Sequence, residues 1–319
     1  MNRSIRALVV LIWGLGVGVS WVSAQSTTPF SFIAWGDSRG ASKGVNTPVL
    51  SGLSNLAIAF DPKFTLFAGD LCTRFDRKCT SSDLIGCMYA INGDGSNNGM
   101  FDRTFVTRGN HDVGNKKTSA AWQAYFDFAG VATDIAAINF TAMTENETYS
   151  FDYGNSHFVS VDVPDDVNVI TPSEISWLDT DLTTAEGRGV IHTFIFWHGP
   201  FYCVDGHCSY TTTLGSDAPA ALVTVFNNHS SIAATFHGHE HVNAHTHLDS
   251  TRITGLTHQF EQFVTGEAGA PPYDCSKTSR FDYCTTTPGF VTVEVNGDAV
   301  TVSQYLQDGS TPQTWTFGK

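Results

Sequence analysis

Five short apolar runs in this 319-residue chain each end at a side chain that can bind a metal ion. "FSFIAW" (30–35) and "KFTLFA" (63–68) are followed by Gly-Asp, and "RTFVTR" (103–108) by Gly-Asn-His-Asp. "VIHTFIFW" (190–197) is followed by a histidine, and "IAATF" (232–236) by "HGHEH". Such runs, bounded by turn residues, are typical of buried strands. Because ligands bind beyond the carboxyl ends of strands in α/β sheets, we expect these side chains to converge.

The segments between these runs predict an α/β fold of packed layers. "PVLSGLSNLAIAF" (48–60) has helical spacing and completes a β-α-β unit with the first two strands. Further helices are expected over 120–128 and 172–185, a hairpin over 149–163, and an antiparallel pair formed by "GFVTVEV" and "AVTVSQYL". Neither an internal repeat nor a linker divides the sequence, so we expect sheets packed face to face in one domain.

The N-terminus has the composition of an export signal. Arg3 and Arg6 precede an uncharged stretch, residues 7–22, and small residues lead up to Ala24. We expect a signal peptide over 1–24 and one domain over 28–319, in a secreted or periplasmic protein. A membrane anchor is the alternative, but the sixteen uncharged residues are fewer than the roughly 20 that a spanning helix needs. We therefore expect no membrane span after signal cleavage.

The expected mature chain is acidic. Removing residues 1–24 takes away two arginines and no acidic residue, which changes the formal charge from -14 to -16. A protein with this charge does not bind nucleic acid by bulk electrostatics. A small anionic substrate would need local positive charge, which metal ions can supply.

Export also suggests how the cysteines are used, because disulfides form in oxidising compartments. The seven are Cys72, Cys79, Cys87, Cys203, Cys208, Cys275 and Cys284. Short separations favour the pairs Cys203 with Cys208 and Cys275 with Cys284, and we prefer Cys79 with Cys87 in the first group. Buried free thiols are the alternative, and a zinc site is not favoured because no CxxC spacing occurs.

The order Gly-Asp, Gly-Asp, Gly-Asn-His-Asp, His and Gly-His-x-His resembles the calcineurin-like metallophosphoesterases, a family that includes the purple acid phosphatases. The resemblance runs from about Phe30 to the C-terminal strands. It implies a four-layer α/β/β/α sandwich of two mixed sheets flanked by helices. It also implies a hydrolase of small phosphate esters, with monoesters favoured, that holds two divalent or trivalent metal ions, Fe, Zn or Mn.

By this resemblance six side chains bind the metals: Asp37 and His241 the first metal, Asp70 both metals as a bridge, and Asn110, His198 and His239 the second. The residue types suit this chemistry. A carboxylate has two oxygens and can bridge cations about 3.5 to 4 Å apart, while neutral imidazoles and an amide oxygen complete the shells. A metal-bridging water would then attack phosphorus.

The resemblance also implies that His111 lies over the substrate, with Asp112 beside it. We hypothesise that Asp112 keeps His111 protonated, so that His111 can protonate the leaving alcohol. Loss of His111 would then slow esters with poor leaving groups more than activated aryl esters.

The chain departs from the family at two positions. Arg39 stands where many members have histidine two residues after the first Asp, and a guanidinium cannot ligate a metal. Arg39 either grips a phosphate oxygen or pairs with a nearby carboxylate. The first metal then keeps only Asp37, Asp70 and His241 plus solvent. Thr73 stands where the purple acid phosphatases have a tyrosine, so we expect no purple charge-transfer colour.

Two further segments contain candidate pocket residues. In the histidine-rich segment "FHGHEHVNAHTH", His237 is expected in a supporting or packing position, and His245 and His247 on the surface or in a pocket wall. In "GEAGAPPYD", Glu267 and Tyr273 are candidate pocket residues, with a plain surface loop as the alternative.

Two other functions compete with phosphate-ester hydrolysis. Because of Arg39, the main alternative is a binding protein on the same fold with an incomplete, slow or inactive metal centre. "GASKG" matches the GxSxG pattern of serine esterases, with Ser42 as nucleophile, but the strand-to-helix turn already holds Asp37. Inhibition by chelators would separate a metal enzyme from a serine esterase.

Overall fold

The computed structural model describes residues 28–41, 44–72, 87, 90–93, 99–112, 122–123, 125–162, 170–204, 220–277, 280–310 and 313–318. The expected signal peptide, Ser42, Thr73, Cys79 and Cys208 lie outside the described residues. Within the described residues, no helix is both long enough and apolar enough to cross a membrane.

The first sheet contains the N-terminal strands and the C-terminal strands. Its described strands have the order β14-β13-β12-β1-β2-β3. They are β1 (Phe30–Trp35), β2 (Thr65–Phe67), β3 (Thr104–Val106), β12 (Gly289–Asn296), β13 (Ala299–Leu306) and β14 (Thr314–Gly318). β1, β2 and β3 are parallel, so their carboxyl ends lie at one edge, and β12 pairs antiparallel with β1. β12 and β13 form the expected antiparallel pair.

The second sheet is built from the middle of the chain. Its described strands have the order β11-β9-β10-β8-β7-β6-β5-β4. They are β4 (Ile138–Thr144), β5 (Thr148–Tyr153), β6 (Ser156–Ser160), β7 (His192–Phe196), β8 (Ile232–His237), β9 (Asn243–Leu248), β10 (Phe260–Thr265) and β11 (Tyr283–Thr285). β6, β7, β8 and β10 are parallel neighbours, and the outer pairs are antiparallel, so this sheet is mixed as well.

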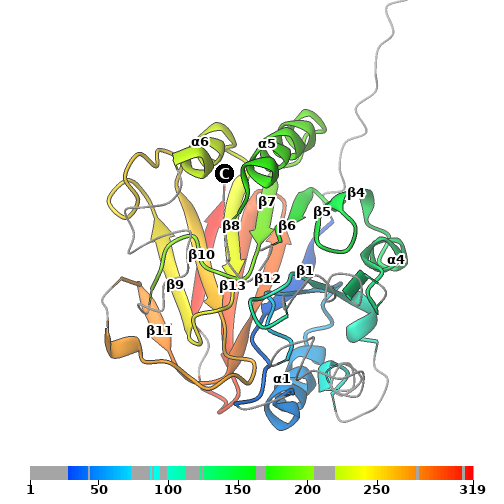
Figure 1. Ribbon diagram of the computed structural model, residues 1–319, viewed down its shortest axis with the longest axis vertical. Helices are drawn as coiled ribbons and strands as arrows, with labels where there is room; N and C mark the ends of the chain where they lie inside the picture. Colours follow the sequence, from blue (N-terminus) through cyan, green and yellow to red (C-terminus); the bar gives the residue numbers. More distant parts are fainter. Residues whose placement is uncertain are drawn as a thin grey trace, which may run out of the picture.

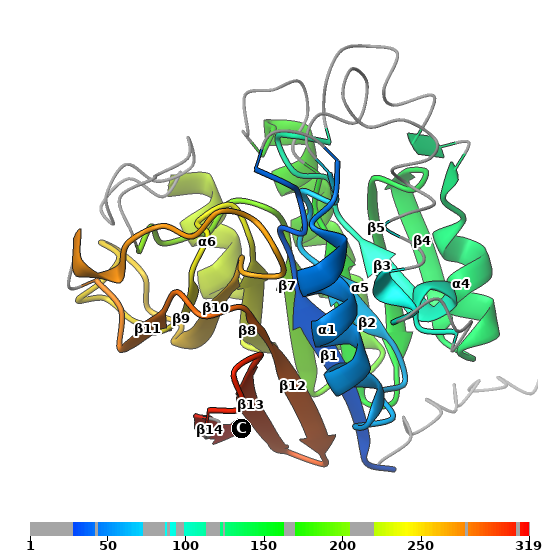
Figure 2. The same cartoon turned by 90° about the horizontal axis from the view of Figure 1, so that it is seen from below.

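Helices cover the outer faces of both sheets. α1 (Thr47–Ile58) packs on the first sheet through Leu50, Leu53 and Ala57, whose helical spacing puts them on one face. Figure 2 shows α1 lying along β1 and β2. α5 (Pro172–Gly187) and α6 (Ala220–Asn228) pack on the second sheet and lie side by side in Figure 1. The four-layer α/β/β/α arrangement expected from the sequence is confirmed.

Aromatic rings fill the space between the two sheets. Phe32 on β1 makes edge contacts with Phe158 on β6, Phe194 on β7 and Phe236 on β8, at ring-centroid distances of 5.2, 5.2 and 5.8 Å. All four rings are fully buried. Such contacts contribute about 0.5 to 1.5 kcal/mol per pair beyond the area they bury. They hold the strand ends of the two sheets in fixed relative positions.

Several elements differ from the sequence-based expectations. In the predicted helix over 120–128, residues 122, 123 and 125 are helical, but 126 and 127 are not, and the separate helix α4 (Phe128–Asp134) begins at its last residue. β4 was not predicted, and its side chains are mostly exposed. The short β11 and the helix α6 were also not predicted from the sequence.

The disulfides agree with the sequence in part. Cys275 and Cys284 are joined, with their Cα atoms 5.9 Å apart, and Cys203 is disulfide-bonded too. The preferred pair of Cys79 with Cys87 is wrong, because Cys87 is a free buried thiol and Cys72 is disulfide-bonded. Burial raises the pKa of Cys87 to about 12, so this thiol is protonated and unreactive at neutral pH.

Candidate metal centre

The predicted ligands converge where the strand ends of the two sheets meet. Asp37 follows β1, Asp70 follows β2, Asn110 lies beyond β3, His198 follows β7, and His239 lies beyond β8. One hydrogen bond joins the loops within each sheet: the Asp37 amide donates to the Gly69 carbonyl at 2.9 Å in the first sheet, and the Gly238 amide donates to the His198 carbonyl at 2.8 Å in the second. A third, from the His239 amide to Asp37 Oδ2 at 2.9 Å, connects the two sheets.

Three of these ligands have strained backbones. Asp37, Asp70 and His239 have φ angles of 59°, 54° and 68°, in the left-handed region that non-glycine residues rarely adopt. Each residue in such a conformation costs of order 1 kcal/mol or more and persists only where the surroundings enforce it. The sharp turns aim all three side chains at one point between the sheets.

Two motif glycines allow the ligands to approach the backbone closely. A Cβ atom on Gly109 would overlap Asp70 Oδ1, and a Cβ atom on Gly238 would overlap Asp37 Oδ2. Neither collision can be relieved without moving a ligand carboxylate. Glycine is therefore required at both positions for the site, not only for a turn.

Replacing Gly238 by Ala is expected to lower metal binding and any metal-dependent activity by at least about tenfold, because it displaces the Asp37 carboxylate. Gly187→Ala is the matched control, since a Cβ there meets nothing within 4 Å. Isothermal titration with Mn²⁺ on both variants checks this. Equal affinities for the two variants would contradict the close-packed site.

Four polar atoms form a compact cluster, which we call the second position. Asn110 Oδ1 lies 3.0 Å from His198 Nε2 and 3.0 Å from His239 Nδ1. The two imidazole nitrogens are 3.3 Å apart, and Asp70 Oδ1 is 3.5 Å from His198 Nε2. Asp37, Asp70 and His198 also bring one ligand atom each within 4.8 Å of the others.

The hydrogen-bonding chemistry of the second position suits a cation. His198 Nδ1 lies 2.7 Å from the Ala68 carbonyl, which can only accept, so in the neutral ring Nε2 presents a lone pair. Lone pairs of Asn110, His198 and Asp70 therefore face each other in a buried place. A cation with ligand bonds of about 2.1 Å would put neighbouring ligand atoms about 3.0 to 3.4 Å apart. The residues present fit a metal ion.

The first position contains Asp37 and His241. His241 Nε2 lies 3.5 Å from Asp37 Oδ1, which accepts no hydrogen bond from the described residues. His241 Nδ1 lies 2.7 Å from the Pro271 carbonyl, so its Nε2 also presents a lone pair in the neutral ring. Tyr273 stacks on the His241 ring at a centroid distance of 4.2 Å and fixes its plane. Tyr273 therefore contacts one of the predicted metal ligands.

Arg39 lies in the first position. Its Nη2 is 3.4 Å from His241 Nε2, and its Nε is 3.5 Å from Asp70 Oδ2. Of the two expectations for Arg39, the ion pair with a nearby carboxylate is the one that the structure shows. The side chain is 12% exposed, so this pair is largely shielded from water.

The two carboxylates differ in their protonation equilibria. Burial raises the pKa of Asp37 well above its ordinary value, and the charge of Asp70 raises it further. Burial would also raise the pKa of Asp70, but the electrostatic effects of His198 and His111, the hydrogen bond from the His111 amide and the charge of Arg39 outweigh it and lower that pKa. Asp70 is therefore the anionic centre of the cluster.

The family model of the calcineurin-like phosphoesterases matches residues 49–243, which is more than half of the chain. The chain belongs to this family. No curated protein sequence matches it significantly. The family assignment agrees with the two mixed sheets flanked by helices and with the buried Asp, Asp and His cluster.

Solved structures with this phosphoesterase fold share little sequence with the chain. The purple acid phosphatase PPD1 from yellow lupin seeds is 14% identical, with a TM-score of 0.65 over 92% of this chain and 54% of that one. GAP50, the anchor in the inner membrane complex of Plasmodium, is 12% identical, with a TM-score of 0.65 over 91% and 89%. PhoD is 10% identical, with a TM-score of 0.58 over 91% and 70%. The likeness shows the fold, and the chain spans about half of the lupin protein.

Asp112 makes other contacts than the sequence suggested. Its Oδ2 accepts hydrogen bonds from the amides of Gly109, Asp70 and Leu71 at 2.9, 2.6 and 3.4 Å. Among the described contacts, none joins Asp112 to the His111 ring. Burial and the charge of Asp70 raise the pKa of Asp112 well above its ordinary value. Asp112 thus positions the loop that carries Asp70 and is not the partner of His111.

His111 lies at the edge of the cluster and is partly exposed. Its amide donates to Asp70 Oδ1 at 2.8 Å, and its Nε2 lies 3.9 Å from Asp70 Oδ2. Burial lowers the pKa of His111 below 6.5, although the charge of Asp70 opposes this. His111 is in reach of a ligand bound at the cluster, with Asp70 as its acidic neighbour.

The other histidines of the tract have different roles. His237 contacts the Trp197 carbonyl and Thr235 Oγ1 through its two ring nitrogens, at 3.1 and 2.9 Å, and burial lowers its pKa to about 3. It is a neutral packing residue. His245 and His247 both contact Glu261 at 2.8 Å on the neighbouring strand. His245 is buried, and His247 lines a cavity of about 210 Å³ away from the cluster.

Glu267 is buried near Asp37, although its sequence context suggested only a pocket residue or a loop. Neither of its carboxyl oxygens accepts a hydrogen bond from the described residues. Burial and the charge of Asp37 raise the pKa of Glu267 to about 9, so the side chain is neutral at pH 7. Its burial follows from the backbone, because Ala268 donates to the Gly36 carbonyl and Ala270 to the Asp37 carbonyl.

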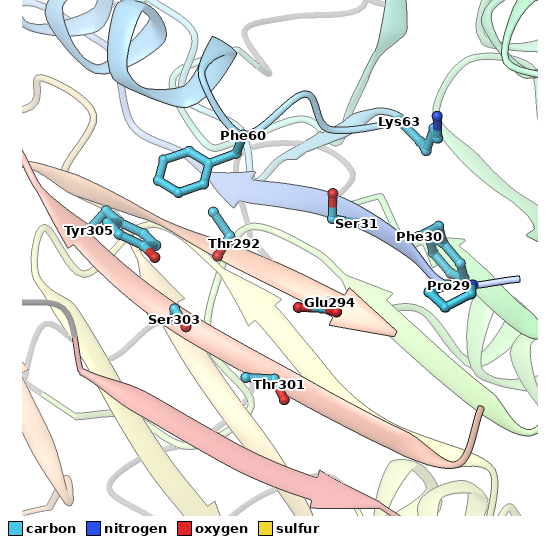
Figure 3. Close-up of a pocket in the computed structure, with 10 residues that line it drawn as sticks. All are labelled: Pro29, Phe30, Ser31, Phe60, Lys63, Thr292, Glu294, Thr301, Ser303 and Tyr305. Carbon is cyan, nitrogen blue, oxygen red and sulfur yellow. The ribbon is translucent and has the colours of Figure 1, made fainter. Parts of the chain in front are cut away.

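A cavity of about 390 Å³ lies away from the cluster, on the outer face of the first sheet. Figure 3 shows Phe60 and Tyr305 at one end of it and Lys63 and Phe30 toward the other. The remaining lining residues are polar side chains of β1, β12 and β13 and Pro29. The six predicted metal ligands do not line this cavity, so it is separate from the candidate centre.

Proposed function

We propose that the chain is a secreted, metal-dependent phosphoesterase that hydrolyses small phosphate esters, with monoesters as the favoured class. The observation that carries this proposal is the convergence of Asp70, Asn110, His198 and His239 at 3.0 to 3.5 Å in a buried place. Membership in the calcineurin-like phosphoesterase family supports it. The signal peptide over 1–24, the domain over 28–319 and the secreted or periplasmic location belong to the same proposal.

In this proposal the chain's own residues hold and orient the reacting groups. Asp70, Asn110, His198 and His239 hold a Mn, Zn or Fe ion, which when bound polarises a phosphoryl oxygen and activates a water molecule. Asp112 holds the backbone that presents Asp70, and the Ala68 carbonyl fixes the His198 ring. Arg39 supplies a fixed positive charge beside the place where an anionic ester would bind.

His111 is proposed to protonate the leaving oxygen at acidic pH. Because its pKa is lowered below 6.5, the protonated fraction falls as pH rises through a range below that value. His111→Ala should therefore reduce hydrolysis of alkyl phosphates about 10²-fold or more and of activated aryl phosphates less, with a larger difference at pH 5 than at pH 7.5. Steady-state kinetics with both ester classes test this. Equal losses at both pH values would remove the acid role.

The direct test of the proposed function is hydrolysis of an aryl phosphate monoester and an aryl phosphate diester by the purified chain. We expect faster turnover of the monoester, loss of activity after chelation, and recovery when Mn²⁺, Zn²⁺ or Fe²⁺ is returned. Ser42→Ala is expected to leave the activity unchanged. No turnover with any of the three metals would reject the phosphoesterase proposal.

A second function is favoured by one observation, the presence of Arg39 in the first position. A chain with an altered centre could bind a partner on the same fold without turnover, and GAP50, an anchor by its description, has the same fold. Absence of turnover together with a folded, metal-binding protein would support this binding function.

A further inference from the structure

The Arg39 guanidinium contacts two of the three side chains that would hold a first metal ion. Nη2 lies 3.4 Å from His241 Nε2, and Nε lies 3.5 Å from Asp70 Oδ2. A guanidinium is always charged and has only hydrogen-bond donors. Its donors therefore lie beside the same lone pairs of His241 and Asp70 that a metal ion would bind.

The backbone of Arg39 is fixed by the turn that follows β1. Arg39 forms a β-bridge with Val45, the Gly40 amide donates to the Gly44 carbonyl at 2.8 Å, and the Asn46 amide donates to the Ser38 carbonyl at 2.8 Å. Asn46 Nδ2 in turn donates to the Gly269 carbonyl at 2.7 Å. The turn is thereby tied to the loop that carries Pro271, the partner of His241 Nδ1.

Arg39 and a metal ion cannot occupy the first position at the same time. His241 Nδ1 is engaged by the Pro271 carbonyl, so only one lone pair of this ring remains, at Nε2. If Arg39 uses that lone pair, the first metal keeps only carboxylates. In the second position, Arg39 contacts only Asp70, through Oδ2, and Asp70 Oδ1 still faces His198. Among the described contacts, none joins Arg39 to Asn110, His198 or His239.

We propose that Arg39 replaces the first metal ion, so that this chain binds one divalent cation, at Asp70, Asn110, His198 and His239, with the guanidinium as the fixed charge beside it. This inference rests on the proposed metal-dependent function and makes it more specific. A centre with one metal and one arginine keeps two positive groups near the phosphate, as paired metals would, but only one of them can activate water.

Metal stoichiometry tests the inference without relying on activity. The full mature chain is loaded with excess Mn²⁺, desalted, and measured by mass spectrometry for metal per protein. We expect about one Mn²⁺ in the wild type and about two in Arg39→His, whose imidazole supplies a ligand. Electron paramagnetic resonance should show an isolated Mn²⁺ spectrum in the wild type and an exchange-coupled pair in Arg39→His.

Two further variants assign the positions. Added to the wild type, His241→Ala should leave about one Mn²⁺ per protein, because His241 belongs only to the first position. Added to Arg39→His, it should lower the metal content from about two Mn²⁺ to about one. His198→Ala should reduce the bound Mn²⁺ to nearly zero, because His198 belongs to the second position. Arg252→His is the matched control, because Arg252 is not part of the cluster and pairs with Asp282 at a distance of 2.6 Å. This variant should still bind about one Mn²⁺ per protein.

The outcomes separate this inference from the proposed function. Two Mn²⁺ in the wild type, with turnover, would overturn the inference and keep the phosphoesterase. One Mn²⁺ in both the wild type and a folded Arg39→His would overturn it as well, because removal of the arginine would not have opened the first position. No bound Mn²⁺ in the wild type would overturn the inference, and a lack of turnover with Mn²⁺, Zn²⁺ and Fe²⁺ as well would overturn the proposed function. The wild-type measurement does not depend on whether any variant folds.

Discussion

Replacing Asp70 by Asn is expected to reduce Mn²⁺ affinity and hydrolysis of an aryl phosphate by more than about 100-fold. Asp70 is the carboxylate that lies nearest to His198, His111 and Arg39, and its pKa is held below its ordinary value by these groups. The asparagine keeps the shape and can still accept the His111 amide hydrogen bond. Only the charge is lost, so folding should be unaffected.

Calorimetric titration with Mn²⁺ and kinetics under saturating metal measure the Asp70→Asn effect, with Asp298→Asn in an exposed turn as the control for a charge change. The melting temperature of metal-free Asp70→Asn should equal that of the wild type or lie a few degrees below it, because the lowered pKa means that the folded state favours the charged carboxylate. An active Asp70→Asn enzyme with unchanged metal affinity would contradict the central role of this carboxylate.

Replacing His157 by Leu is expected to lower the free energy of unfolding by about 3 to 5 kcal/mol. His157 is fully buried between two carboxylates, with Nδ1 2.6 Å from Asp152 Oδ1 and Nε2 2.9 Å from Asp181 Oδ2. Arg188 also holds Asp152, through two bonds of 2.8 and 2.9 Å. Removing the imidazole leaves buried carboxylates without their shared partner.

The cost of His157→Leu should depend on pH in a defined direction. Burial opposes protonation of His157, but Asp152 and Asp181 raise its pKa above 6.5, so its contribution is complete below 6.5 and declines as pH rises through the folded-state value. Burial would raise the pKa of Asp152, but hydrogen bonds from His157 and Arg188 lower it to about 2, so its contribution is present above 3.8 and is lost as pH falls toward 2. The largest cost is therefore expected between these limits.

Urea unfolding of the wild type and His157→Leu at pH 5.5 and pH 8.5 measures this dependence. His247→Leu is the control, because His247 is 44% exposed and its pair with Glu261 should contribute about 1 kcal/mol or less. A cost for His157→Leu that is no larger than that of the control would show that the buried cluster contributes little to stability.

Much of the candidate site could be predicted from the sequence, because each ligand follows within a few residues of an apolar run that is typical of a buried strand. Asp37, Asp70 and His198 were placed in this way, and the structure brings them together. Their close approach also depends on Gly109 and Gly238, which leave room for the carboxylates of Asp70 and Asp37. This steric role is clear only from the packing of the loops in the structure.

Other features could not be read from the sequence because they depend on contacts between distant segments. Asp112 follows His111 directly, but its carboxylate points to the backbone of the neighbouring Asp70 loop. Glu267 lies in a segment rich in Gly and Pro, yet the segment runs along the end of β1 and buries it. The predicted pair of Cys79 with Cys87 failed for the same reason, since Cys87 packs in the core as a free thiol.

The most direct test of the central claim is the anomalous scattering of crystals of the mature chain grown with Mn²⁺. The account predicts a strong peak bonded to Asp70, Asn110, His198 and His239, which disappears in His198→Ala crystals. A Mn²⁺ peak elsewhere, or none at this position while the crystallised protein still hydrolyses phosphate esters, would contradict it.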